Sequence, residues 1–100
     1  MMEPNIAIQA LCRSAATSYR GKLTPDALLA FLRTGVVADD CHTQLEYAIE
    51  EVPAGLWRKA LGEFSHEEQA QMRVVIAAYA KIRRLYLVPE MVGWLTLHDR

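Results

Sequence analysis

The segment closest to a chemical motif is 66–70, His-Glu-Glu-Gln-Ala, which begins like the helical zinc-binding sequence H-E-x-x-H. That motif needs two histidines one turn apart on one helix face, with the glutamate as general base. Ala70 stands where the second histidine would be, so the ligand pair is missing. Cys41 and His42 are neighbours, about 100° apart on a helix, and do not share a metal naturally. We therefore expect no metal site and no cofactor.

Other catalytic patterns are also missing from the sequence. The glycines are too far apart to build a phosphate-binding loop, standing at Gly21, Gly35, Gly55, Gly62 and Gly93. No G-x-S-x-G nucleophile elbow occurs. The acidic residues lie on faces that we expect to be solvated. We therefore expect a protein that is not an enzyme.

The segment 24–52 has the outline of a helix-turn-helix, with two helices joined across residues 35–39. A DNA-recognition helix presents Arg, Lys, Asn or Gln to base edges and phosphates. The second helix here instead presents an acidic face, made of Asp39, Thr43, Glu46 and Glu50, with Glu51 to one side. That face would repel DNA, so we expect no direct sequence-specific DNA reading.

Every long segment shows apolar residues at a helical period, and none shows sustained alternation, which predicts an all-α fold. We expect a compact single-domain bundle of five to six helices, spanning 1–100, around a long central helix. The expected helices are 5–19, 25–34, 39–52, 54–62, 65–87 and 90–97. The last segment, which contains Trp94, is also compatible with a strand.

The strongest helix signal is 65–87, where Ser65 and Glu68 stand in capping-box register. Its apolar residues cover an arc of about 200° on a helical wheel, twice what a helix lying on a surface needs. We therefore expect this helix to be contacted by several neighbours at once. Ile82 lies within the arc, so an aspartate there should unfold the domain.

Composition and the chain ends favour a cytoplasmic protein. Hydrophobic residues make up 52% and the net charge is −1. No uncharged apolar run approaches the roughly 20 residues that a membrane span needs, so we expect no membrane partner. The first five residues carry an acid where a signal peptide needs positive charge. Cys12 and Cys41 are expected to be free and buried, as small hydrophobic residues.

Charge is distributed unevenly along the chain. Residues 1–38 hold four basic and two acidic residues (+2), 39–68 hold two and eight (−6), and 69–100 hold five and two (+3). One interpretation is a solvated face, balanced by a basic residue of the long helix (Arg73, Lys81, Arg83 or Arg84). The other is an acidic docking surface, which would speed association with a basic partner and set its orientation.

Surplus hydrophobicity gives a second hint of binding, because a domain of this size buries only about two thirds of its chain surface. Trp57 beside Arg58 is the best candidate for an exposed anchor, since interface hot spots are rich in Trp and Arg. The alternative is that Trp57 and Trp94 cap the ends of the bundle.

We therefore expect a protein that binds a partner with a basic surface. The predicted contact residues are Asp39, Thr43, Glu46, Glu50, Glu51, Trp57 and Arg58. In its size, lack of motifs and acidic segment, the chain resembles the anti-CRISPR proteins, small phage-encoded inhibitors. That resemblance implies that the acidic segment blocks the nucleic-acid-binding surface of a CRISPR-Cas effector complex. The alternatives are a helical nucleic-acid-associated regulatory protein, acting through its basic C-terminal helix, and a self-associating phage assembly module.

Overall fold

The structure, a computed structural model, describes residues 6–16 and 23–97. These residues form six α-helices and one short 3₁₀ helix, with no strand among them. The elements are α1 (Ile6–Ala16), α2 (Pro25–Thr34), η1 (Asp39–Cys41), α3 (His42–Glu51), α4 (Ala54–Leu61), α5 (His66–Arg83) and α6 (Pro89–Leu95). The all-α prediction is confirmed, and the last segment is a helix. The predicted helix ends at 5 and 17–19 lie outside the described residues.

Local capping signals place the helix boundaries as predicted. The Thr24 side chain accepts a hydrogen bond from the Ala27 backbone N–H at 3.1 Å, and Pro25 follows at the first helical position. Gly35 ends α2 in the left-handed conformation at φ 75°. At α5, Ser65 and Glu68 form both halves of a capping box. Short-range chemistry therefore sets where these helices start and stop.

Helix α5 ends at Arg83, four residues before the predicted end. Arg84 adopts φ 55°, and its backbone N–H bonds back to the last turn. The Leu85 N–H then bonds to the Ala80 carbonyl at 2.9 Å, and the Tyr86 N–H donates to Glu50 Oε2 at 2.8 Å. Beyond the end of α5, the backbone N–H of Tyr86 is therefore bonded to α3 and no longer to a carbonyl of its own helix.

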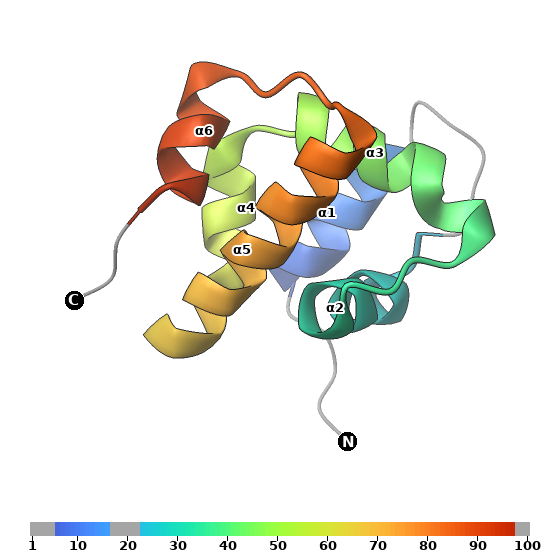
Figure 1. Cartoon of the computed structure of the whole chain (residues 1–100). Helices are drawn as coiled ribbons and strands as arrows, with labels where there is room; N and C mark the ends of the chain where they lie inside the picture. The colour runs from blue at the N-terminus through green and yellow to red at the C-terminus, as the bar shows by residue number, and fades with distance from the viewer. Residues whose placement is uncertain (1–5, 17–22, 98–100) are drawn as a thin grey trace.

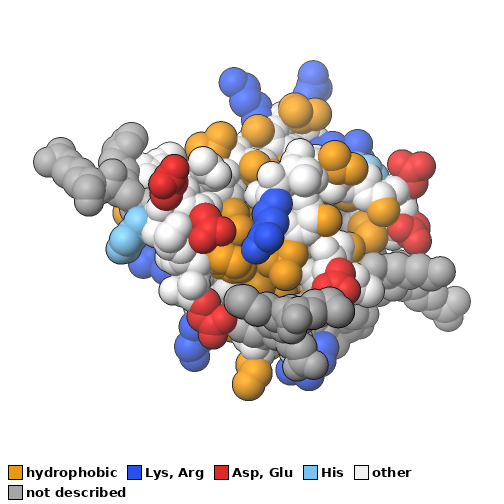
Figure 2. Space-filling model, turned by 90° about the horizontal axis from the view of Figure 1, so that it is seen from below, with side chains coloured by type: hydrophobic (Ala, Val, Ile, Leu, Met, Phe, Trp, Pro, Cys, Tyr) orange, Lys and Arg blue, Asp and Glu red, His pale blue; other side chains and the backbone are white. Residues whose placement is uncertain are grey.

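The packing arrangement leaves one side of α5 uncovered. Helix α1 lies behind α5 and packs against α4, α3 and α2, whereas α5 packs against α2, α6 and α3 (Figure 1). Val74 is 67% exposed and Ile82 is 77% exposed. The expectation that neighbours cover the whole apolar arc is therefore wrong. Hydrophobic side chains also reach the surface on the face seen in Figure 2, where acidic and basic side chains are interspersed.

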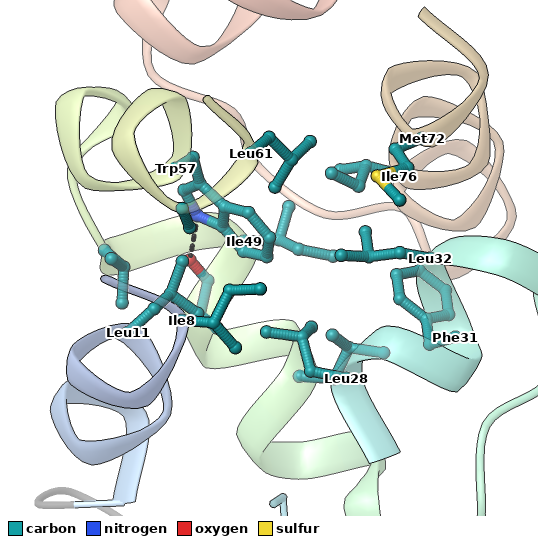
Figure 3. Close-up of a cluster of buried hydrophobic side chains, with 14 of the residues drawn as sticks. Ile8, Leu11, Leu28, Phe31, Leu32, Ile49, Trp57, Leu61, Met72 and Ile76 are labelled. Atoms are coloured by element: carbon teal, nitrogen blue, oxygen red, sulfur yellow. Dashed lines mark hydrogen bonds between the residues drawn. The ribbon is translucent and has the colours of Figure 1, made fainter. Parts of the chain in front are cut away.

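The core is a single cluster to which all six helices contribute. Side chains from α1, α2, α3, α4 and α5 converge in Figure 3, among them Ile8, Leu28, Phe31, Ile49, Trp57, Leu61 and Ile76. The Trp57 Nε1–H donates to the Ala48 carbonyl at 3.0 Å, and its ring centroid lies 6.2 Å from that of Trp94 on α6. The tryptophans therefore join α4 to α3 and α6 inside the protein.

Both cysteines are free and buried, as predicted. Burial raises the pKa of Cys12 to about 11, so its thiol stays protonated at neutral pH. Cys41 shares this direction because of burial and the neighbouring Asp40 carboxylate, which raise its pKa. These thiols act as packing groups.

One buried polar side chain fixes α3 against the start of α2. Gln44 is buried, and its Oε1 accepts a hydrogen bond from the Leu23 backbone N–H at 2.7 Å. Leu23 itself is buried next to the α2 cap. This contact holds the inner face of α3 in place and sets which residues of α3 face outward.

No helix in the described ranges is long and apolar enough to cross a membrane.

A matched pair of substitutions tests the packing of α5. Ile82→Asp should leave the chain folded and cost under about 1 kcal/mol, because the side chain already meets water. Ile76→Asp should unfold it, because Ile76 is fully buried and the new carboxylate would lack a partner. Urea unfolding followed by circular dichroism measures both. Loss of the helical signal in the Ile82 variant would show that this side of α5 is packed.

Candidate functional site

Four of the predicted contact residues line one groove on the surface. Thr43, Glu46, Glu50 and Glu51 surround a hollow of about 410 Å³ together with two tyrosines, Tyr47 and Tyr86. Five of these six residues lie on α3, and Tyr86 comes from the segment between α5 and α6. Segments at least 35 residues apart in sequence therefore build a single hollow, which we call the α3 groove.

The helical period of α3 explains why these residues share a face. Residues three or four positions apart lie on the same side of a helix. The opposite side of α3 is buried in the core through Gln44, Leu45, Ala48 and Ile49. The groove residues are therefore forced outward by the burial of their neighbours.

Glu46 is held by a basic residue of α5. Arg83 donates to Glu46 Oε2 from Nε at 3.0 Å and from Nη2 at 2.8 Å. The side chains are 45% and 26% exposed, so the pair contributes at most about 1 kcal/mol after solvent screening. For Glu46, the interpretation of an acidic residue balanced by the long helix is therefore confirmed.

Glu50 also has an internal role. Its Oε2 accepts the backbone N–H of Tyr86 at 2.8 Å, which anchors the segment after α5 to α3. The Tyr86 side chain remains 73% exposed at the edge of the groove. Glu50 therefore places an aromatic ring beside the acidic residues, and one of its carboxylate oxygens already accepts a hydrogen bond within the protein.

A polar chain runs from the groove toward the interior. The Tyr79 hydroxyl lies 2.8 Å from His42 Nδ1, and the two rings stack with centroids 5.9 Å apart. Burial is the main reason why the pKa of Tyr79 is raised to about 12. The negative charge of Glu46 and a hydrogen bond with Glu46 raise this pKa further, whereas the positive charge of Arg83 lowers it. The phenol is therefore neutral at physiological pH and serves to position Glu46.

The remaining acidic candidates differ in location. Glu51 is exposed and lines the groove. Asp39 is exposed in η1 and does not line the groove. Asp40, next to it, lies with Oδ1 3.7 Å from Cys41 Sγ. The acidic face thus consists of a groove on α3 and a separate exposed pair in η1.

The prediction that Trp57 is an exposed anchor is wrong. Its side chain is 0% exposed, because α4 packs its apolar side against α1 and the indole N–H bonds to α3. Trp94 is buried as well, at 2% exposed. Arg58 is exposed on α4 but does not line the α3 groove. The predicted Trp-Arg anchor therefore does not exist at the surface.

Two tyrosines of the groove were missed by the sequence reasoning. Tyr47 stands on α3 next to Glu46, so its helical position could have placed it on this face. Tyr86 falls within the helix predicted over 65–87, so the sequence pattern places it on an apolar helix face. Its true position depends on the left-handed Arg84 and on the Glu50 contact, which no local pattern indicates.

The chemistry available at the groove is recognition of a cation. Carboxylates accept hydrogen bonds from Arg and Lys, and tyrosine rings attract cations to their faces. No three His, Cys, Asp or Glu side chains in the described part of the chain lie close enough to hold a metal ion.

No known protein family, curated protein or solved structure matches the chain. The groove is therefore the strongest guide to function.

The pKa of Tyr79 gives a test of the polar chain. An unperturbed tyrosine titrates near pH 10, and Tyr79 near 12, so the native state keeps a proton that the unfolded state loses. The stabilisation is fully present below pH 10 and is lost as the pH rises toward 12. Tyr79→Phe should cost about 1 kcal/mol at pH 8.

This difference between the two proteins should shrink between pH 10 and 12, because only the natural chain loses this contribution there. Urea unfolding at several pH values measures it. Parallel stability profiles for the natural chain and the phenylalanine variant would show that Tyr79 is not held in this way.

Proposed function

We propose that this protein is a non-enzymatic protein-binding protein that captures a basic segment of its partner in the α3 groove. The observation that carries the proposal is the meeting of three glutamates and two tyrosines around one hollow. Neither the acidic residues alone nor an exposed tyrosine alone would select a partner. Together they suit a side chain that is both cationic and able to stack, which favours arginine.

Binding proceeds through the most accessible groups of the groove. A partner guanidinium lies against the Tyr86 ring, which is exposed and whose backbone is held by Glu50. Glu51 accepts its hydrogen bonds from the rim. Glu46 can exchange its exposed Arg83 pair for the partner, since such a surface pair is weak. Tyr86 thereby takes the anchoring role that the sequence suggested for Trp57.

The more specific form of the proposal concerns the partner. Proteins that bind nucleic acid carry surfaces rich in Arg and Lys, and an acidic groove seated there competes with the phosphate backbone. We propose such a cytoplasmic effector complex, of the CRISPR-Cas kind, as the target of a phage-encoded inhibitor. The resemblance in size and acidic character to anti-CRISPR proteins supports this form, and the groove supplies its contact surface.

The alternative of nucleic-acid association through the basic C-terminal part receives less support. Arg73 is buried, and Arg83 is paired with Glu46. Both side chains would have to contribute to a phosphate track along α5. Their burial and pairing leave Lys81 on this helix and Arg84 at its C-cap as the exposed cations available for such a track.

A labelled nona-arginine peptide tests the groove. The natural chain should bind it at low salt, and Glu51→Lys or Tyr86→Ala should each weaken binding about tenfold. Glu63→Lys is the matched control, because it makes the same charge change at an exposed residue outside the groove. Fluorescence anisotropy measures the dissociation constants.

If Glu63→Lys weakened peptide binding as much as Glu51→Lys, binding would depend on net charge alone. That result would contradict the proposal that the peptide binds in the α3 groove. A parallel titration with a labelled 20-base-pair DNA duplex distinguishes the alternative. Tighter binding to the duplex than to the peptide would favour the nucleic-acid-associated function.

A further inference from the structure

The outer side of α5 carries an exposed apolar ridge whose residues do not line the α3 groove. Val74, Ala78 and Ile82 are four residues apart, so they form one row along the helix. All three are exposed, including two of the large hydrophobic residues with the highest exposure in the described chain. A row of this kind on a water-soluble helix marks an interaction surface.

Apolar hollows flank this ridge on both sides. One, of about 240 Å³, lies toward α2 and is lined by Phe31, Gly35, Val74, Val75, Ala78, Tyr79 and Ile82. The other, also about 240 Å³, lies toward α6 and is lined mainly by Ala77, Ala80, Leu85, Leu87, Val92 and Leu95. A ridge between two hollows fits another helix whose own ridge has the same shape.

The charges on this side of α5 are arranged symmetrically about Val74. Glu67 lies seven residues before it and Lys81 seven residues after it, so both fall on the same side of the helix. Each lies about 10.5 Å from Val74 along the helix axis. This side of the helix therefore begins with the acidic Glu67, continues with the apolar Val74 and Ala78, and ends with the basic Lys81 beside Ile82.

We propose that a second copy of this chain packs on the outer side of α5, with the two helices antiparallel about a two-fold axis near Val74. Glu67 of each copy then lies opposite Lys81 of the other, and Val74 lies against its own counterpart. Ala70 of each copy comes opposite Ala78 of the other, and these small side chains allow close approach of the two helices. The same patch serves both copies, as a two-fold interface requires.

The charge order selects this occupant and this direction. A parallel pairing would bring Glu67 against Glu67 and Lys81 against Lys81, which like-charge repulsion opposes. Antiparallel pairing turns both contacts into opposite charges and also sets the helix dipoles against each other favourably. The α3 groove lies on another side of α5 and stays accessible in the dimer, so each dimer would present two grooves.

Exchanging the two charges tests the dimer. Glu67→Lys and Lys81→Glu should each raise the dimer dissociation constant about tenfold, because each places like charges together twice. The double variant E67K/K81E should restore the natural value, since the pair is only reversed. Sedimentation equilibrium over a range of concentrations measures the constants, and circular dichroism checks that each variant is folded.

The rescue is specific to the interface. Within one chain the two residues lie about 21 Å apart along α5, too far for a direct contact. Both substitutions also oppose the helix dipole, so their effects on α5 itself would add and not cancel. A monomeric natural chain at all concentrations, or a double variant that dimerises no better than the singles, would overturn the proposal.

Discussion

The burial of the Trp57 indole is the constraint on which the rest of the structure depends. Its N–H bonds to the Ala48 carbonyl of α3, its ring faces Trp94 of α6, and its helix packs against α1. A buried indole needs a partner for its N–H, and α3 provides one in the Ala48 carbonyl at 3.0 Å. With α3 fixed through its inner side, its glutamates must face outward.

Two tertiary contacts then convert that outward side into a groove. Arg83 reaches Glu46, and Glu50 takes the Tyr86 N–H, so the end of α5 and the following segment are tied to α3. The acidic residues thereby act twice, as internal ties and as walls of the hollow. Because Glu46 is paired with Arg83 and Glu50 already accepts a hydrogen bond from the Tyr86 N–H, Glu51 and Tyr86 carry most of the proposed recognition.

Local features of the fold could be predicted from sequence and nonlocal ones could not. The caps at Thr24 and Ser65 and the stop at Gly35 depend on neighbouring residues, so their chemistry is visible in the chain itself. Helical period also placed the α3 residues on one face. The burial of Trp57 and the exposure of Ile82 depend on which helices pack against each other. Apolar periodicity indicates which residues share a helix face, but it does not indicate which neighbouring helix covers that face.

In this protein Trp57 supports the groove from within and does not touch the proposed partner. Trp57→Phe is the most direct test, with urea unfolding and nona-arginine binding measured on the same protein. We expect a loss of about 2 kcal/mol in the free energy of unfolding, from the lost hydrogen bond and the smaller ring. Peptide affinity of the folded variant should stay within about twofold of the natural chain. Unchanged stability together with lost peptide binding would instead show that Trp57 lies at the surface and contacts the partner.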